Sequence, residues 1–290
     1  MYVTRFAPSP TGPLHLGHVY SAAIGYRRAL LSGGRFLLRI EDIDSARSSK
    51  DWENQIYDDL SWIGLSWEVP VLLQSDRQRH YKTALEHLAT LGLLYPCRCT
   101  RADIRAALSA PQEGTPFHGP DGLIYPGTCR HRPMSDATPN DALRLNMHAA
   151  LTYLARNKPL QSLSIIETGP IYDGHHSYDA THFQDAIGDV VMARRDMGTS
   201  YHLSVVIDDA AQEISEVVRG ADLWEATPLH RLMQCLLNLP ELKWHHHTLM
   251  RDENGKRLAK RDDARAISTY RKAGESPKEV LRRVGLDRLD

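Results

Sequence analysis

Hydrophobic residues in the first 94 positions alternate between segments with strand-like spacing and segments with helical spacing. Residues 2–7 favour a strand, and residues 15–31 then place hydrophobic side chains at helical spacing. Residues 35–40 favour a second strand, which ends on the acidic segment 41–44. This order predicts a βαβ unit in which the first loop and the carboxylates share one end of a parallel sheet.

Two further helices are expected before residue 95, each with a hydrophobic stripe and a glycine at its end. The stripes are Trp52, Ile56, Leu60 and Ile63 before Gly64, and Tyr81, Leu85, Leu88 and Leu91 before Gly92, with Ser75 or Asp76 as the cap of the second helix. These positions are expected to form core rather than a site.

Residues 95–184 differ in composition. Seven prolines lie between residues 96 and 139. That density excludes a long regular element and predicts a small irregular unit that needs a stabilising cross-link. The cysteines of this stretch could supply it. Strand-like pieces follow at residues 142–147 and 165–166.

Residues 185–239 return to strands and a helix. Strands are expected at residues 188–194, 201–207 and 214–219, with a hairpin turn at residues 196–198. Thr227 is expected to cap a helix with Pro228 at its first position, which makes Cys235 a buried small hydrophobic residue. Ser276 and Glu279 are spaced as a capping box for a terminal helix.

Composition narrows the class of protein without naming a function. The 290 residues are 42% hydrophobic and 24% charged, as in ordinary globular proteins, and the net charge of −1 means that any nucleic-acid surface must be local. No hydrophobic run approaches a membrane span and the N-terminus lacks a signal-peptide pattern, so a cytoplasmic protein with no membrane contact is expected. Four cysteines do not make a disulfide scaffold and favour metal binding or free thiols.

The candidate chemistry starts in the Pro- and Gly-rich segment 5–18, which enters the first helix. A helix N-terminus attracts anions, and phosphate is the obvious one. The segment carries neither a dinucleotide fingerprint nor a P-loop, but His15 and His18 lie on one face of the first turn. Alone, this pair favours capping or packing. A second candidate is the segment 251–272, whose eight basic and four acidic residues could hold phosphates or could form a solvated charged face.

Several motifs together resemble a class I aminoacyl-tRNA synthetase. The resemblance covers residues 1 to about 275, and the first motif is specific because so many residues of one loop would have to coincide. The general signatures are His15-Leu-Gly-His18, Val205-Val-Ile-Asp-Asp209 and Lys256-Arg-Leu-Ala-Lys-Arg261, and the motifs similar to the glutamyl group are Arg5-Phe-Ala-Pro-Ser-Pro-Thr-Gly12, Arg39-Ile-Glu-Asp-Ile-Asp44 and Val217-Val-Arg-Gly220.

The pattern and the resemblance together predict an α/β protein with a Rossmann-like parallel-sheet nucleotide-binding domain. Its first half is expected at residues 1–94 and its second half at 185–239. An inserted zinc-containing α+β subdomain is expected at 95–184. The signature loop and a short C-terminal helical segment take residues 240–290.

The resemblance also implies an activity. About thirty residues follow Lys260, so an anticodon-binding region is not expected, and the chain resembles the truncated branch of the glutamyl group. That branch activates L-glutamate with ATP, bound with Mg, and esterifies it to the queuosine base of tRNA(Asp). A monomer is expected. The alternatives are a non-catalytic tRNA-binding paralogue and a nucleotidyltransferase of the same superfamily acting on a small molecule.

Site roles follow from the resemblance, residue by residue. The ATP phosphates are assigned to the first helix and to the signature loop, where His15, His18 and Lys260 are the catalytic residues. The glutamate pocket needs a cation for each carboxylate and an anion for the ammonium. The ATP-binding residues are His15, Gly17, His18, Arg257 and Lys260, and the glutamate-binding residues are Arg5 and Arg219 as cations, Glu41 as anion, and Ser9 and Tyr201 as hydrogen-bond partners.

Two positions depart from the family pattern. The second signature reads Arg257-Leu-Ala-Lys260 and lacks the usual hydroxyl at Ala259, which predicts weaker transition-state stabilisation. Val205 replaces a polar residue that glutamyl-tRNA synthetases turn towards the substrate, which predicts lower glutamate affinity.

The proline-rich insertion carries the candidate metal site. Cys97, Cys99 and Cys129 could be free thiols, but the resemblance implies one structural zinc per chain, held by the three cysteines and Tyr125. His131 is the alternative fourth ligand, because imidazole is the more usual zinc ligand. The segment His245-His-His247 has no neighbouring cysteine and is expected to be an exposed loop, or at most a nucleotide-facing one.

Overall fold

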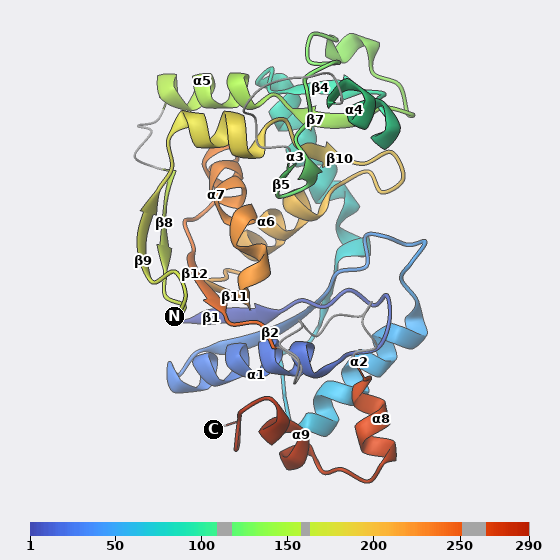
Figure 1. Cartoon of the computed structure of the whole chain (residues 1–290), viewed down its shortest axis with the longest axis vertical. Coiled ribbons are helices and arrows are strands. Elements are labelled where there is room, and N and C mark those ends of the chain that lie inside the picture. Colours follow the sequence, from blue (N-terminus) through green and yellow to red (C-terminus); the bar gives the residue numbers. More distant parts are fainter. Residues whose placement is uncertain (109–117, 158–162, 251–264, 290) are drawn as a thin grey trace.

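The computed structural model describes residues 1–108, 118–157, 163–250 and 265–289. Figure 1 shows the N-terminal strands and first helix in the lower half, beside the C-terminal helices, and residues 94–97, 101–108 and 142–157 at the top. Among the described residues, no helix is long and hydrophobic enough to cross a membrane.

The N-terminal βαβ unit has the predicted form. Strand β1 (Val3–Phe6) pairs in parallel with β2 (Arg35–Ile40), and α1 (Leu16–Leu31) connects them. Strand β2 pairs in parallel with the short β3 (Leu72–Leu73). The carboxyl ends of β1 and β2 and the start of α1 therefore lie at one end of this sheet, as expected for a site in a parallel α/β fold.

A second sheet lies beside the N-terminal one. Strands β11 (Glu216–Gly220), β12 (Lys243–His247) and β8 (Ser164–Glu167) pair in parallel in that order, and β9 (Gly174–Ser177) is antiparallel to β8. The backbone of Ser215 donates to the Val3 carbonyl at 2.9 Å, which places β11 beside β1.

The upper part is antiparallel. Strand β7 (Ala142–Leu145) pairs with β4 (Leu94–Cys97) on one side and with β10 (Val191–Ala193) on the other. The other elements of this part are α4 (Arg101–Leu108), the hairpin of β5 (His118–Gly119) and β6 (Gly122–Leu123), α5 (Met147–Asn157), and the short helical turns η2 (Met134–Asp136) and η4 (His182–Ile187).

Residues 201–207 are not the predicted strand. They belong to α6 (Tyr201–Ala211), which Ser200 caps by accepting a hydrogen bond from the Leu203 backbone at 3.3 Å. Most of this helix is buried, so its hydrophobic residues do not reveal a helical period. The turn at residues 196–198 therefore leads into a helix instead of closing a hairpin.

Two other helix starts differ by a few residues from the sequence patterns. A turn, η1 (Gln74–Arg77), precedes α3 (Gln78–Thr90), so neither Ser75 nor Asp76 is its cap. Similarly, η5 (Ala221–Ala226) runs directly into α7 (Thr227–Leu236), which makes Ala226 the cap residue and Thr227 the first helical residue.

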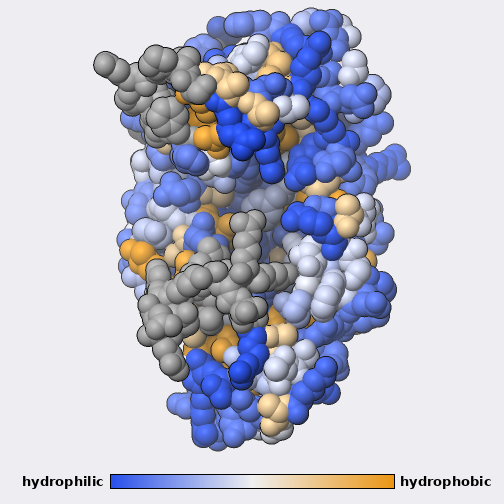
Figure 2. Space-filling model, turned by 45° about the vertical axis from the view of Figure 1, so that its right-hand side comes forward, coloured by the Kyte–Doolittle hydropathy of each residue, from blue (hydrophilic) through white to orange (hydrophobic). Residues whose placement is uncertain are grey.

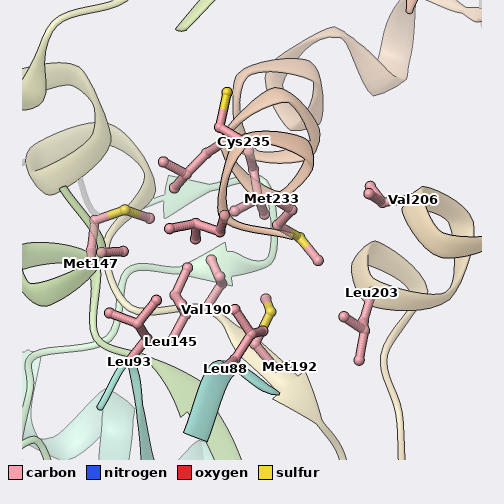
Figure 3. Packing of buried hydrophobic residues seen from close by; sticks show 14 of the residues in the cluster. Leu88, Leu93, Leu145, Met147, Val190, Met192, Leu203, Val206, Met233 and Cys235 are labelled. Atoms are coloured by element: carbon pink, nitrogen blue, oxygen red, sulfur yellow. The ribbon is translucent and has the colours of Figure 1, made fainter. Parts of the chain in front are cut away.

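Two large hydrophobic clusters form most of the core. One joins α3, α5, α6 and α7 to the antiparallel sheet and includes Cys235, which is buried as predicted (Figure 3). The other packs α1 and α2 (Lys50–Ile63) against the C-terminal helices α8 (Ile267–Lys272) and α9 (Pro277–Arg283). The predicted capping box of Ser276 and Glu279 starts α9.

Candidate active site

A cleft of about 470 Å³ opens where β1, β2 and β11 end, beside the start of α1. Figure 2 shows the middle of the molecule hollowed and bordered largely by hydrophilic residues. Eight of the predicted site residues line this cleft: Arg5, Ser9, His15, Gly17, His18, Glu41, Tyr201 and Arg219. Lys260, Arg257 and Ala259 lie outside the described residues, whereas Leu249 and Met250, just before them, also line the cleft.

The two histidines cap α1 and also face the cleft. The His15 Nδ1 accepts from the Gly17 backbone and the His18 Nδ1 accepts from the His15 backbone, each at 3.1 Å. A neutral imidazole that accepts at Nδ1 carries its proton on Nε2. Each ring therefore has an N–H donor at Nε2 beside a helix N-terminus, an arrangement that favours an anion. Capping and anion binding are thus compatible here.

Gly17 leaves room for the His15 ring against the first turn of α1. A Cβ atom at this position would lie 3.0 Å from Cε1 and 3.1 Å from Nδ1 of His15. The close approach of the helix backbone to the imidazole therefore depends on the absence of a side chain.

Arg5 and Glu41 belong to a buried array of alternating charges. Arg5 donates to both carboxylate oxygens of Asp209, at 2.8 and 3.2 Å, and Arg39 donates to Asp209 at 2.6 Å and to Glu41 at 3.1 Å. Burial opposes ionisation of Asp209, but the two arginines outweigh it and lower the pKa of this carboxyl. Burial raises the pKa of Glu41 despite the neighbouring arginines. The sequence motifs contained Arg39 and Asp209 but did not indicate this role.

Arg219 has a different environment. Its Nε donates to the His246 Nε2 at 3.0 Å, and Nη1 lies 3.2 Å from the His230 Nδ1. Its Nη2 donates to the Leu223 carbonyl at 3.0 Å and to the Thr227 hydroxyl at 2.7 Å. None of these partners is a carboxylate, and burial lowers the pKa of Arg219. In the described part of the chain, it is a buried cation at the cleft that hydrogen-bonds only neutral groups.

The histidine segment 245–247 is not the predicted exposed loop. It forms the end of β12, where all three histidines are buried. Polar partners at the end of the neighbouring strand β8 satisfy two of the buried rings: the His246 ring contacts Glu167 at 2.6 Å, and His245 contacts Thr168 at 3.1 Å. His246 and His230 contact Arg219, and Glu167 contacts His246, so these residues support the cleft from behind, a role that the sequence patterns did not indicate.

Val205 lies in the hydrophobic cluster around α6, is 1% exposed and is not among the residues that line the cleft. Its helical position accounts for the hydrophobic side chain, since the side of α6 on which it lies packs against α7 and α3.

The candidate metal ligands form one cluster at the top of the molecule. The sulfur atoms of Cys97, Cys99 and Cys129 lie within 4.8 Å of one another. The Tyr125 hydroxyl lies 3.4 Å from the Cys97 sulfur and 3.3 Å from that of Cys99, whereas His131 is exposed. Burial disfavours a thiolate at Cys129, but hydrogen bonds led by the one from Tyr125 lower its pKa to about 7. Three converging thiols are a ligand set suited to Zn²⁺.

The family model "tRNA synthetases class I (E and Q), catalytic domain" matches residues 1–120 and 169–288. The chain belongs to this family. The membership, with the parallel sheet, confirms the predicted α/β class I synthetase fold.

Two curated relatives in this synthetase family are similar over nearly the whole chain. A glutamyl-Q tRNA(Asp) synthetase of Rhodobacter capsulatus is 55% identical over 98% of this chain and 100% of its own length. The Nocardia farcinica protein of the same name is 40% identical over 96% of this chain and 81% of its own.

Among solved structures, a glutamate tRNA ligase from Elizabethkingia meningosepticum in complex with its amino acid has a TM-score of 0.71 at 25% identity. It covers 98% of this chain, and the chain spans 60% of its length. The methionyl-tRNA synthetase of Mycobacterium tuberculosis has a TM-score of 0.57 at 9% identity, a likeness of fold alone.

Proposed function

We propose that this chain activates L-glutamate with ATP and transfers it to the queuosine base of tRNA(Asp). The observation that carries the proposal is the cleft, which combines two arginines, a buried carboxylate and a pair of histidine N–H donors at a helix N-terminus. The similarity to a glutamyl-Q tRNA(Asp) synthetase along its entire length supports the choice of acceptor.

The proposed binding mode gives each charge of glutamate a counterpart. Arg5 and Arg219 take the two carboxylates, Glu41 takes the ammonium, and the hydroxyls of Ser9 and Tyr201 complete the hydrogen bonds. Arg39 acts behind the cleft, because its hydrogen bonds to Asp209 and Glu41 fix the positions of both carboxylates.

The proposed reaction needs positioning and electrostatic stabilisation. A carboxylate oxygen of glutamate attacks the α-phosphorus of ATP, the bond to the bridging oxygen breaks, and pyrophosphate leaves with Mg. His15 and His18 donate to the phosphates through Nε2, beside the positive end of α1. Lys260 and Arg257 are proposed to hold the β- and γ-phosphates. A hydroxyl of queuosine then attacks the glutamyl carbonyl, and AMP leaves.

A second cavity adjoins the cleft and is a suitable place for the acceptor. It measures about 340 Å³ and shares Ser9, Thr11, Glu41 and Tyr201 with the cleft. We propose this cavity for the queuosine base, because three of the residues it shares with the cleft, Ser9, Glu41 and Tyr201, are those proposed to bind glutamate. The acting form is proposed to be a cytoplasmic monomer, which light scattering would test.

The proposed metal is one structural zinc held by Cys97, Cys99, Cys129 and Tyr125. Support for Tyr125 over His131 comes from its hydroxyl, which contacts two of the thiols. When bound, the metal would cross-link the proline-rich segment, where the described residues around the ligands form a small hydrophobic cluster.

The proposed function is tested by glutamate-dependent exchange between ATP and pyrophosphate without tRNA. The second measurement is the transfer of labelled glutamate to tRNA(Asp), with and without queuosine. Glu41→Gln should lose exchange, whereas Glu68→Gln, an exposed carboxylate paired with Arg35, is the matched control. Binding of tRNA with no exchange would favour the non-catalytic paralogue, and exchange without transfer to the modified tRNA would refute the acceptor. Exchange supported by another small molecule but not by glutamate would favour the nucleotidyltransferase.

A further inference from the structure

Arg219 lies in the middle of a buried chain of hydrogen bonds. On one side, its Nε donates to the His246 Nε2 at 3.0 Å, and the His246 Nδ1 lies 2.6 Å from the Glu167 Oε2. Since Nε2 accepts, the neutral His246 ring carries its proton on Nδ1 and donates it to Glu167. Glu167 is itself fixed, because its Oε1 accepts from the backbone of His246 and Gly169 at 2.8 and 2.7 Å.

On the other side, two histidines extend the chain to the insertion. The Arg219 Nη1 donates to the His230 Nδ1 at 3.2 Å, and the His230 Nε2 lies 2.9 Å from the His202 Nδ1. The His202 Nε2 lies 2.8 Å from the Asp121 Oδ1. The arginine can only donate, so each ring accepts at Nδ1 and donates from Nε2. Asp121 lies in the turn between β5 and β6, and the chain therefore links the insertion to the cleft.

The two cleft arginines therefore differ in their partners: a carboxylate binds Arg5, whereas neutral groups bind Arg219. Arg5 is bidentate on the Asp209 carboxylate, which it shares with Arg39, so a carboxylate partly compensates its charge. Arg219 is oriented by two imidazoles, and burial lowers the pKa of both His230 and His246, so both are neutral near pH 7. A neutral acceptor satisfies the geometry of a guanidinium without cancelling its charge.

We propose that His246 and His230 are positioning residues that orient Arg219 and leave its charge for a carboxylate of the ligand. Glu167 and Asp121 act through them by fixing which ring nitrogen accepts. The inference rests on the proposed function, since glutamate is the ligand whose carboxylate Arg219 receives. It assigns discrimination between a carboxylate and an amide to residues that do not touch the substrate.

Glu167→Gln is the decisive variant because it keeps shape and removes one acceptor. The amide has a single oxygen, whereas the carboxylate receives the His246 ring on one oxygen and two backbone N–H groups on the other. If the amide nitrogen faces the ring, His246 must accept at Nδ1, and its Nε2–H then opposes the Arg219 N–H. In the other orientation, the amide nitrogen faces the backbone N–H groups of Gly169 and His246, and this clash of donors displaces the Glu167 side chain.

In ATP–pyrophosphate exchange, we expect Glu167→Gln to raise the KM for glutamate about tenfold or more and to leave the KM for ATP unchanged. The preference for glutamate over glutamine should fall. Asp189→Asn is the matched control, since Asp189 is a buried carboxylate that accepts from Arg130 and Tyr95 on one oxygen and from the Met147 backbone on the other, away from Arg219. It should lose comparable stability without changing the KM for glutamate. An unchanged KM in folded Glu167→Gln would overturn the inference.

Nitrogen-15 NMR of histidine-labelled protein gives a readout independent of activity. We expect His246 to be protonated on Nδ1 and His230 on Nε2 in the wild type. The opposite tautomer at His246 would overturn the inference even if the enzyme is active. If Glu167→Gln does not fold, Asp121→Ala replaces it, because the Asp121 side chain is exposed, and this variant should also raise the KM for glutamate. A wild-type chain with the expected tautomers but no glutamate-dependent exchange would refute the proposed function instead.

Discussion

Replacing Arg219 by lysine keeps the positive charge but removes the planar guanidinium, whose N–H groups point in several fixed directions. The guanidinium donates to His246 and His230 and to two oxygens, those of Leu223 and Thr227. An ammonium has three N–H donors and radiates them from one nitrogen. At least one buried acceptor therefore loses its donor, which we expect to lower the free energy of unfolding by about 1–3 kcal/mol.

The effect on substrate should exceed the effect on folding. An ammonium that satisfies the buried acceptors has no donor left for glutamate, and a lost hydrogen bond between charged groups costs about 1.5–3 kcal/mol, or about 10- to 150-fold in kcat/KM for glutamate. Exchange kinetics measure this change and urea unfolding measures the stability. Arg231→Lys is the matched control, because Arg231 is buried and bonded to Glu241 and the Ser164 carbonyl outside the cleft. An unchanged kcat/KM in Arg219→Lys would refute a role in carboxylate binding.

Three further predictions concern other parts of the chain. Gly17→Ala should raise the KM for ATP about tenfold, measured by exchange, because its Cβ would displace the His15 ring; an unaltered KM contradicts the assignment. Cys97→Ser should remove most of the zinc measured by elemental analysis, and unchanged zinc content would exclude this site. In the folded state the pKa of His246 is lowered to about 4, so below pH 6.5 the unfolded state takes up a proton that the folded state does not. Urea unfolding should therefore show the free energy of unfolding falling as the pH falls, by at most about 3 kcal/mol for this residue, and His246→Gln should abolish that part. A pH profile that this variant leaves unchanged would contradict the prediction.

Local signals predicted the parts of the fold that short segments determine. The βαβ unit follows from alternating periods and a proline-rich turn, and the capping box of Ser276 and Glu279 needs only four residues. Residues 201–211 show the limit of this approach. Because most positions of α6 are buried, the hydrophobic run has no polar face to mark a helical period, and the strand and helix interpretations could not be separated.

The site divides in the same way. Arg5, Glu41 and Arg219 stand in motifs and could be identified one by one, and all three line the cleft. Their supporting residues could not, because the pairing of His246 with Glu167 joins positions 79 residues apart. A histidine in an isolated sequence indicates exposure as readily as burial, and only the neighbouring strand decides between them.

The contrast between the two cleft arginines shows why such support matters for function. Asp209 orients Arg5 but also compensates part of its charge, together with that of Arg39, so Arg5 offers a substrate geometry and a shared charge. Neutral imidazoles orient Arg219 at the cost of leaving a cation buried, which burial itself disfavours. A ligand carboxylate relieves that cost, whereas an amide of the same shape does not. In the proposed binding mode, selectivity for the acid is expected because the described residues place no carboxylate in contact with Arg219, so the ligand supplies the counter-charge.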